Sequence, residues 1–207
     1  MNVIALTGPQ AVGKTTTAQI MKTVIESEYN CKAAVFSFAD SLRYFTSDVF
    51  GQEYIAASKD RNLKDAPMVD LFIKFFGIKI DSDISPRQVL VKLGESMRAR
   101  FGKDIFCTAL GNTIEASDAD YAIIDDLRKE NELNWLRYTY GQRDNHSLMV
   151  LALNREDVPN SYDFGDVADF LDFPLVDKIE TLASCENPYY NKHNYETINS
   201  ILVTYHG

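Results

Sequence analysis

The stretch that decides the fold is NVIALTGPQAVGKTTT, residues 2–17. It begins with an apolar run, residues 2–6, of the kind that forms a strand buried on both faces. Residues 8–15 then match the pattern G-x-x-x-x-G-K-[ST] at every specified position. Residues 15–28 have the composition of a helix. The motif therefore stands between a predicted strand and a predicted helix, which is the context that a phosphate-binding loop requires.

The specified positions of this phosphate loop, residues 8–15, have chemical tasks. Glycines let the backbone turn so that successive N–H groups point at phosphate oxygens, and the following helix directs its positive end there. Lys14 is expected to reach the β- and γ-phosphates of ATP, and the Thr15 hydroxyl to coordinate Mg²⁺. We therefore expect ATP and Mg²⁺ as ligands. The residues assigned to nucleotide binding are Gly8, Ala11, Val12, Gly13, Lys14, Thr15 and Thr16.

Beyond the loop, predicted strands alternate with predicted helices. The further strands are expected at 32–38, 121–125, 147–153 and 174–179, and the further helices at 40–50, 86–100, 103–114, 132–138 and 197–205. This alternation predicts a three-layer α/β P-loop NTPase fold, with a central parallel sheet of about five strands and helices on both faces. We expect a single domain, residues 1–207, with an excursion at about 52–84 that caps the acceptor site.

Bulk properties narrow the function classes. The chain of 207 residues is 45% hydrophobic and carries a net charge of −9, so nucleic-acid and anionic-membrane binding are disfavoured. No apolar run approaches the roughly 20 residues of a membrane span. The three cysteines are dispersed, which indicates reduced thiols in a cytoplasmic protein. The histidines have no metal-ligand spacing.

Two carboxylates follow the predicted strand at 121–125. Ligands of such folds bind at the carboxyl ends of the parallel strands. Asp125 and Asp126 are therefore placed to hold a Mg²⁺-bound water or a substrate hydroxyl. The alternative is that an aspartate here caps the following helix. We favour the functional interpretation, because a phosphate loop predicts an acidic residue at such a strand end.

Arginines and lysines near predicted strand and helix ends form a second group. Taken alone, such residues more often belong to a solvated surface than to a site. A phosphate acceptor, however, is already a dianion near neutral pH and needs no general base. Its site must instead supply cations that hold two polyanions in line. The sequence has no compelling Ser/His/Asp or Cys/His constellation, so it suits a phosphate acceptor better than a hydroxyl acceptor.

Four separated segments resemble the deoxynucleoside monophosphate kinases found chiefly in bacteriophages. They are the phosphate loop, FADSLR at 38–43, SPRQ through LGE to FGKD at 85–104, and DLR with NE at 126–132. The resemblance covers residues 2–155, and its specificity comes from the order and spacing of the segments. Residues 156–207 show no motif of that family.

The resemblance implies transfer of the γ-phosphoryl group of ATP to a deoxynucleoside monophosphate. It places Arg43 near the acceptor phosphate and makes Arg87 and Arg128 phosphate clamps. Together with Lys14, these two clamps are the candidate catalytic residues. Arg155 falls where the family has an arginine near ATP.

The same resemblance implies a nucleoside pocket. Gly94 and Phe106 would line it, with Phe106 stacking on the base where the family has tryptophan. Asp126 and Glu132 would accept hydrogen bonds from the base or sugar. The sequence departs from the family at two of these positions. In the nucleoside pocket, Phe106 lacks the N–H donor of tryptophan. In the phosphate loop, Thr15 replaces a frequent aspartate, in keeping with the general P-loop pattern.

Two alternatives remain open at this level. The chain could be a P-loop kinase of another small acceptor, such as dephospho-coenzyme A, or an ATP-binding regulatory module without an acceptor. The expected partners are small molecules, with neither nucleic acid nor membrane, and a homodimer is left open. The expected location is the cytoplasm, or the host cytoplasm if the protein is viral.

Overall fold

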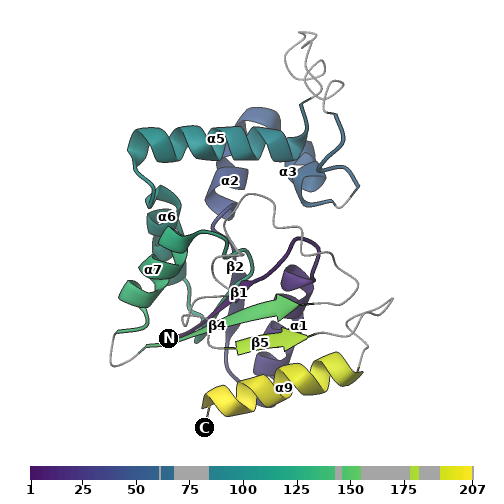
Figure 1. Ribbon diagram of the computed structural model, residues 1–207, viewed down its shortest axis with the longest axis vertical. Helices are drawn as coiled ribbons and strands as arrows, with labels where there is room; N and C mark the ends of the chain where they lie inside the picture. Colours follow the sequence, from purple (N-terminus) through teal and green to yellow (C-terminus); the bar gives the residue numbers. More distant parts are fainter. Residues whose placement is uncertain (61, 68–83, 143–145, 155–177, 182–191, 207) are drawn as a thin grey trace. The chain divides into compact units, whose positions relative to one another are not determined.

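A computed structural model of the protein describes residues 1–60, 62–67, 84–142, 146–154, 178–181 and 192–206 (Figure 1). The chain divides into two compact units. The first comprises residues 1–38 and 111–207, and the second comprises residues 39–110. The single-domain expectation therefore stays a prediction, and the second unit extends on both sides of the expected excursion at 52–84.

The first unit is built on a sheet of five parallel strands in the order β2-β3-β1-β4-β5. The strands are β1 (Asn2–Thr7), β2 (Ala33–Phe36), β3 (Tyr121–Ile124), β4 (Ser147–Asn154) and β5 (Lys178–Thr181). In this order β1 is the central strand. Because the strands are parallel, the segments that follow β1, β2 and β3 all leave from the same edge of the sheet.

Helices cover this sheet. Those of the first unit are α1 (Lys14–Glu28), α7 (Glu130–Thr139) and α9 (Lys192–His206), together with the last residues of α6 (Ile105–Glu115). Ile4 and Leu6 of β1 belong to a buried core that includes side chains of α1 and α9. Val3 and Ala5 alternate with them, face the other side and are equally buried. The expected three-layer α/β P-loop fold is therefore confirmed.

The second unit is helical in its described residues. Its helices are α2 (Asp40–Phe50), α3 (Gln52–Lys59), α5 (Pro86–Phe101) and the first residues of α6. Tyr54 is fully buried among Phe50, Val89 and other apolar side chains, and its hydroxyl donates to the Pro86 carbonyl over 3.1 Å. Ser85 and Gln88 form the capping box that starts α5, in line with the Ser-Pro start expected from the sequence.

Some element boundaries differ from the expected ones. β2 ends at Phe36 rather than at residue 38, because Ser37 and the Phe38 backbone turn to bond carboxylates instead of continuing the ladder. The helix expected at 103–114 begins at Ile105, after Gly102 has ended α5. The strand expected at 174–179 is β5, Lys178–Thr181, and the remainder of that expectation falls outside the described residues.

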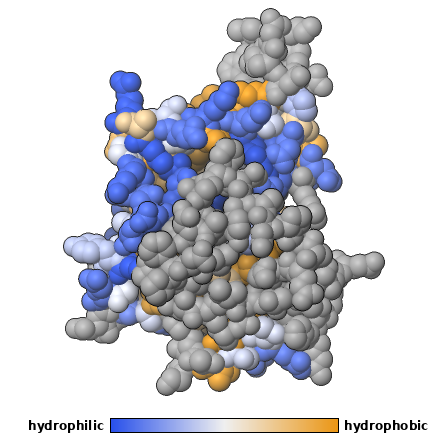
Figure 2. Space-filling model, in the orientation of Figure 1, coloured by the Kyte–Doolittle hydropathy of each residue, from blue (hydrophilic) through white to orange (hydrophobic). Residues whose placement is uncertain are grey.

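The described surface is mixed in hydropathy. Figure 2 shows hydrophilic residues over much of the described surface in that view, with smaller hydrophobic areas among them. Within the described part of the chain, no helix combines the length and apolar character that crossing a membrane would need.

Candidate nucleotide-binding site

The phosphate loop connects the end of β1 to the start of α1 (Figure 1). Three of its residues have positive φ: Gly8 at 132°, Ala11 at 64° and Gly13 at 104°. Two of them are glycines, for which this conformation costs little. A Cβ atom at Gly8 would also lie well inside van der Waals distance of the Leu153 carbonyl oxygen on β4. Gly8 is therefore required both by the turn and by the neighbouring strand.

The lysine of the motif lies folded over its own loop. Lys14 is 9% exposed, and its Nζ donates to the carbonyl oxygens of Gly8 and Pro9, both over 2.7 Å. Burial, as the largest cause, and the charge of Arg128 together lower the pKa of this ammonium group to about 8, although Asp126 and Asp125 act in the opposite direction. The ammonium group is thus bonded to neutral oxygens in a place where a phosphate would stabilise its charge.

The hydroxyl of Thr15 is bonded to the carboxylate that follows β3. Thr15 Oγ1 donates to Asp125 Oδ2 over 2.7 Å, across 110 positions of sequence. Asp125 is 7% exposed, and its other oxygen, Oδ1, accepts from Ser37 Oγ at the end of β2. When a hydroxyl donates its proton to a carboxylate, its lone pairs stay available for a cation. Three consecutive neighbours of the sheet, β1, β3 and β2, therefore contribute to one polar cluster.

The next residue, Asp126, is fixed by a backbone group. Its Oδ1 accepts from the Phe38 N–H over 2.7 Å. Arg128 follows two residues later and is exposed, yet its charge is the foremost among the neighbours that affect the pKa of Lys14. The charges of Asp126 and Arg128 therefore both act on Lys14 of the phosphate loop, while their expected contacts with a substrate stay predictions.

Glu132 has a structural task in this unit. It is 4% exposed, and its Oε2 accepts from the backbone N–H groups of Arg128 and Lys129 over 3.1 and 3.0 Å. These bonds cap the start of α7 and hold the segment that carries Arg128. One carboxylate oxygen of Glu132 is therefore already bonded to the backbone. The expected bond from Glu132 to a base or sugar stays a prediction.

The two arginines of the second unit that were assigned to the acceptor phosphate are paired with carboxylates inside that unit. Arg43 Nη1 contacts Asp40 Oδ1 over 3.0 Å. Arg87 faces Asp65 in a two-pronged arrangement, with Nε to Oδ1 at 2.6 Å and Nη2 to Oδ2 at 3.2 Å. Their expected bonds to an acceptor phosphate are predictions that would require these ion pairs to open or to be shared.

Gly94 and Phe106 lie near each other in the second unit, and their expected role in a nucleoside pocket stays a prediction. A Cβ atom at Gly94 would be 3.9 Å from Phe106 Cε2 and 3.3 Å from Leu42 Cδ2. Phe106 is 4% exposed, however, and the Arg98 guanidinium lies over its ring at 4.7 Å from the centroid. Stacking of a base on Phe106 stays a prediction, since a cation already occupies a face of the ring.

Two further residues assigned to nucleotide binding belong to the loop and to α1. Val12 is fully buried and belongs to the core, and Thr16 is half-buried in the first turn of α1. Arg155, expected near ATP, lies outside the described residues.

Sequence reasoning missed Ser37. It singled out Asp125 as one of a pair but did not connect it to Thr15, and it gave no task to Ser37. The available signal was positional: both residues directly follow predicted parallel strands, so both belong to the ligand-binding edge. What was lacking was the strand order, which alone puts β2 next to β3.

The residues at this edge fit a magnesium ion held together with a nucleotide. The described residues contain no group of three or more His, Cys, Asp and Glu side chains that could hold a metal by themselves. Mg²⁺ favours oxygen ligands, is usually held by few protein groups and takes the rest from phosphates and waters. The Thr15 hydroxyl and the nearby Asp125 carboxylate supply oxygen groups of that kind.

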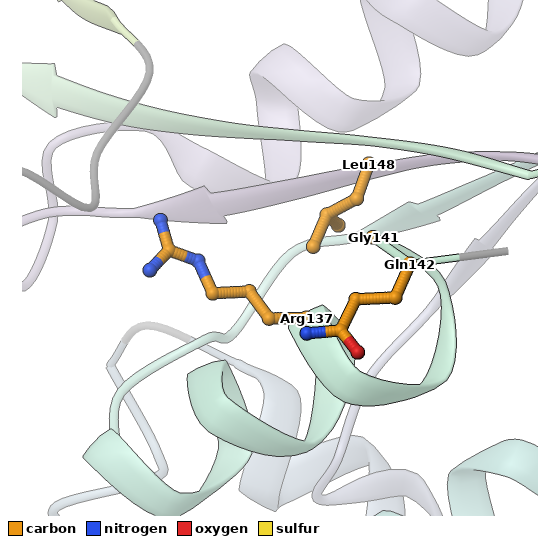
Figure 3. Close-up of a pocket in the computed structure, with 4 residues that line it drawn as sticks. All are labelled: Arg137, Gly141, Gln142 and Leu148. Atoms are coloured by element: carbon orange, nitrogen blue, oxygen red, sulfur yellow. The ribbon is translucent and has the colours of Figure 1, made fainter.

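A separate pocket lies away from these residues. It has a volume of about 300 Å³ and is lined by Arg137, Gly141, Gln142 and Leu148 (Figure 3). Arg137 belongs to the last turn of α7, and Leu148 is the second residue of β4. The pocket is thus near the amino end of a parallel strand, whereas the phosphate loop follows the carboxyl end of β1. None of the residues assigned from the sequence lines it.

Comparisons with known proteins were made for the whole chain. No protein-family model and no curated protein matches it. One solved structure that resembles it is that of a protein assigned to plasmid partition in Borrelia burgdorferi B31, bound to AMPPNP. The two share 16% identity over 98% of each chain, with a TM-score of 0.41. A likeness this distant carries no argument about function, so the functional case rests on the residues themselves.

Proposed function

We propose that this protein transfers the γ-phosphoryl group of ATP to a nucleoside or deoxynucleoside monophosphate, giving ADP and the corresponding diphosphate. An oxygen of the acceptor phosphate forms the new bond to the γ-phosphorus. The bond from that phosphorus to the β–γ bridging oxygen breaks, and ADP leaves. The acceptor phosphate is already a dianion near neutral pH, so this reaction needs no residue to remove a proton.

The observation that carries the proposal is the proximity of Arg128 to Lys14. Two cations on separate segments lie close enough for the charge of one to lower the pKa of the other. The carboxylates of Asp126 and Asp125 oppose this effect in part, and further anions beside the two cations would lower the electrostatic free energy again. A γ-phosphate and an acceptor phosphate would supply those anions, and their charge in the transition state would be stabilised by both groups. Mg²⁺, when bound, neutralises part of the charge on the ATP phosphates.

The choice of a deoxynucleoside monophosphate as acceptor is supported by the order and spacing of the segments at 38–43, 85–104 and 126–132. In this proposal Arg43 and Arg87 bind the acceptor phosphate, Gly94 and Phe106 line the nucleoside site, and Asp126 contacts the nucleoside. The proposal also includes cytoplasmic location, small-molecule substrates as partners with a homodimer left open, and Arg155 as a contact of ATP.

The deciding experiment is ADP production by the purified protein with ATP and Mg²⁺, in the presence of dGMP, dTMP, dCMP, dAMP or their ribonucleotide counterparts. We expect at least one deoxynucleoside monophosphate to stimulate ADP production strongly. Stimulation by dephospho-coenzyme A alone would favour the other kinase. Slow hydrolysis that no acceptor stimulates would contradict a kinase and favour a regulatory ATP-binding module.

A further inference from the structure

The ends of β2 and β3 meet at the nucleotide-binding edge in a defined register. Phe36 pairs with Ile124 across the two strands, and the Asp125 N–H donates to the Phe36 carbonyl over 3.1 Å. Ser37 and Asp125 each come one residue after that pair. The sheet itself therefore brings the Ser37 hydroxyl to the Asp125 carboxylate, and Ser37 Oγ donates to Asp125 Oδ1.

The Asp125 carboxylate is consequently held on both of its oxygens. Oδ1 accepts from Ser37, and Oδ2 accepts from Thr15 over 2.7 Å. A carboxylate with a single bonded oxygen can turn about its Cβ–Cγ bond, since this torsion has only a shallow preference. A carboxylate bonded on both oxygens is fixed in its plane. That plane determines where the proton of the Thr15 hydroxyl points, and hence where its lone pairs face.

We infer that Ser37 is a positioning residue, which orients the Asp125 carboxylate so that the Thr15 hydroxyl presents its lone pairs to Mg²⁺ bound with ATP. The inference rests on the ATP·Mg²⁺ binding of the proposed function. It is independent of which acceptor is phosphorylated. The three residues lie within the first unit and come from segments that follow β1, β2 and β3.

A purely structural role for Ser37 makes a different prediction. If the hydroxyl only satisfied a buried acceptor, its loss would destabilise the fold and leave the effect of Mg²⁺ on ATP affinity unchanged. If it positions Asp125, its loss affects the metal-bound complex selectively. Partners that orient metal-binding groups typically change metal affinity by about 10–100-fold when removed.

The experiment compares the dissociation constants of ATP with Mg²⁺ and of ATP with EDTA, measured by calorimetry without an acceptor. We expect Ser37→Ala to weaken MgATP binding about tenfold or more and to leave metal-free ATP within about twofold, because the amides of the loop and Lys14 are intact. Ser37→Thr keeps the hydroxyl and should restore the wild-type ratio. The matched control is Ser27→Ala on α1, where the lost hydroxyl bonds only the Val24 carbonyl of its own helix.

Equal weakening of both forms by Ser37→Ala, or weakening of neither, would overturn the inference. If Ser37→Ala does not fold, Ser37→Cys takes its place, because a thiol has a similar size and is a weaker donor. The same two dissociation constants of ATP are then compared for this variant. If the wild-type protein binds no ATP, both this inference and the proposed function are wrong. Wild-type protein that binds MgATP but phosphorylates no acceptor would remove the kinase proposal alone, and the Ser37 result would still stand.

Discussion

The cation of the phosphate loop and the arginines of the second unit are held in different ways. Lys14 bonds the neutral carbonyl oxygens of Gly8 and Pro9, whereas Arg43 and Arg87 are each paired with a carboxylate of their own unit. A phosphate that approaches Lys14 replaces dipoles with a full negative charge. A phosphate that approaches Arg43 or Arg87 must compete with an existing anion. The ATP side is therefore organised in advance, while the proposed acceptor side needs an exchange of partners.

The largest expected effect is that of Lys14→Ala. Neighbouring backbone N–H groups can hold the phosphates, but Lys14 is the cation that the loop itself supplies. We expect no detectable transfer of phosphate in the ADP-production assay. Near-normal activity of this variant would show that the phosphate loop has been wrongly assigned.

Arg128→Ala tests the other cation at this edge. We expect a decrease in kcat/KM of about 10²–10⁴-fold, as for the loss of a charge contact made in the transition state. The measurement is steady-state kinetics with the best acceptor. An unchanged kcat/KM would place Arg128 on the surface with no part in the reaction. The control is Arg137→Ala, which removes a basic side chain from the last turn of α7, away from the loop.

Gly8→Ala and Gly13→Ala distinguish two costs of an added methyl group in the loop: a steric clash with β4 and the strain of a positive φ. Both residues have positive φ, but only at Gly8 would the added methyl group meet another strand, at the Leu153 carbonyl. We expect Gly8→Ala to lower the free energy of unfolding by about 2–4 kcal/mol, and Gly13→Ala by about 1–2 kcal/mol. Urea denaturation measures both, and equal losses would contradict the close approach of loop and β4.

The pH dependence of ATP binding tests the pKa of Lys14. The group is cationic below about pH 8 and loses its proton as the pH rises through that value. From about pH 7, where the terminal phosphate of ATP is ionised, ATP affinity should change little up to the pKa of Lys14 and decline above it, by at most about tenfold per pH unit. In Arg128→Ala the decline should begin at higher pH, because a charge that lowers the pKa has gone. A profile that stays flat up to pH 10 would argue against a lowered pKa.

The smallest effects are expected where the second unit already pairs its charges. Arg87→Ala should raise the acceptor KM about tenfold, whereas Asp65→Ala, which removes only the other member of the pair, should change it less than about threefold. Calorimetric or kinetic titration with the acceptor distinguishes them. Equal effects of the two variants would mean that the ion pair supports the fold and does not contact the acceptor.

Much of the fold could be predicted because its signals are local. The glycines of the loop, the apolar run before it and the Ser-Pro start of α5 act over a few consecutive residues, and the structure places each element close to its expected range. The ends of strands were less predictable where a residue bonds a distant carboxylate instead of continuing the sheet. β2 ends early because Ser37 bonds Asp125 and the Phe38 N–H bonds Asp126. The hydrophobic periodicity of the sequence contains no information about these bonds.

By itself, the sequence determined that a strand, a phosphate loop and a helix follow one another at residues 2–28, because backbone preference and hydrophobic spacing are properties of contiguous residues. Only the tertiary structure decided that Ser37 and Thr15 share Asp125, 88 and 110 positions away. It also decided that Arg128 lies beside Lys14 and that Arg98 covers Phe106. Such contacts depend on the order and register of parallel strands and on how helices pack, which no local pattern specifies.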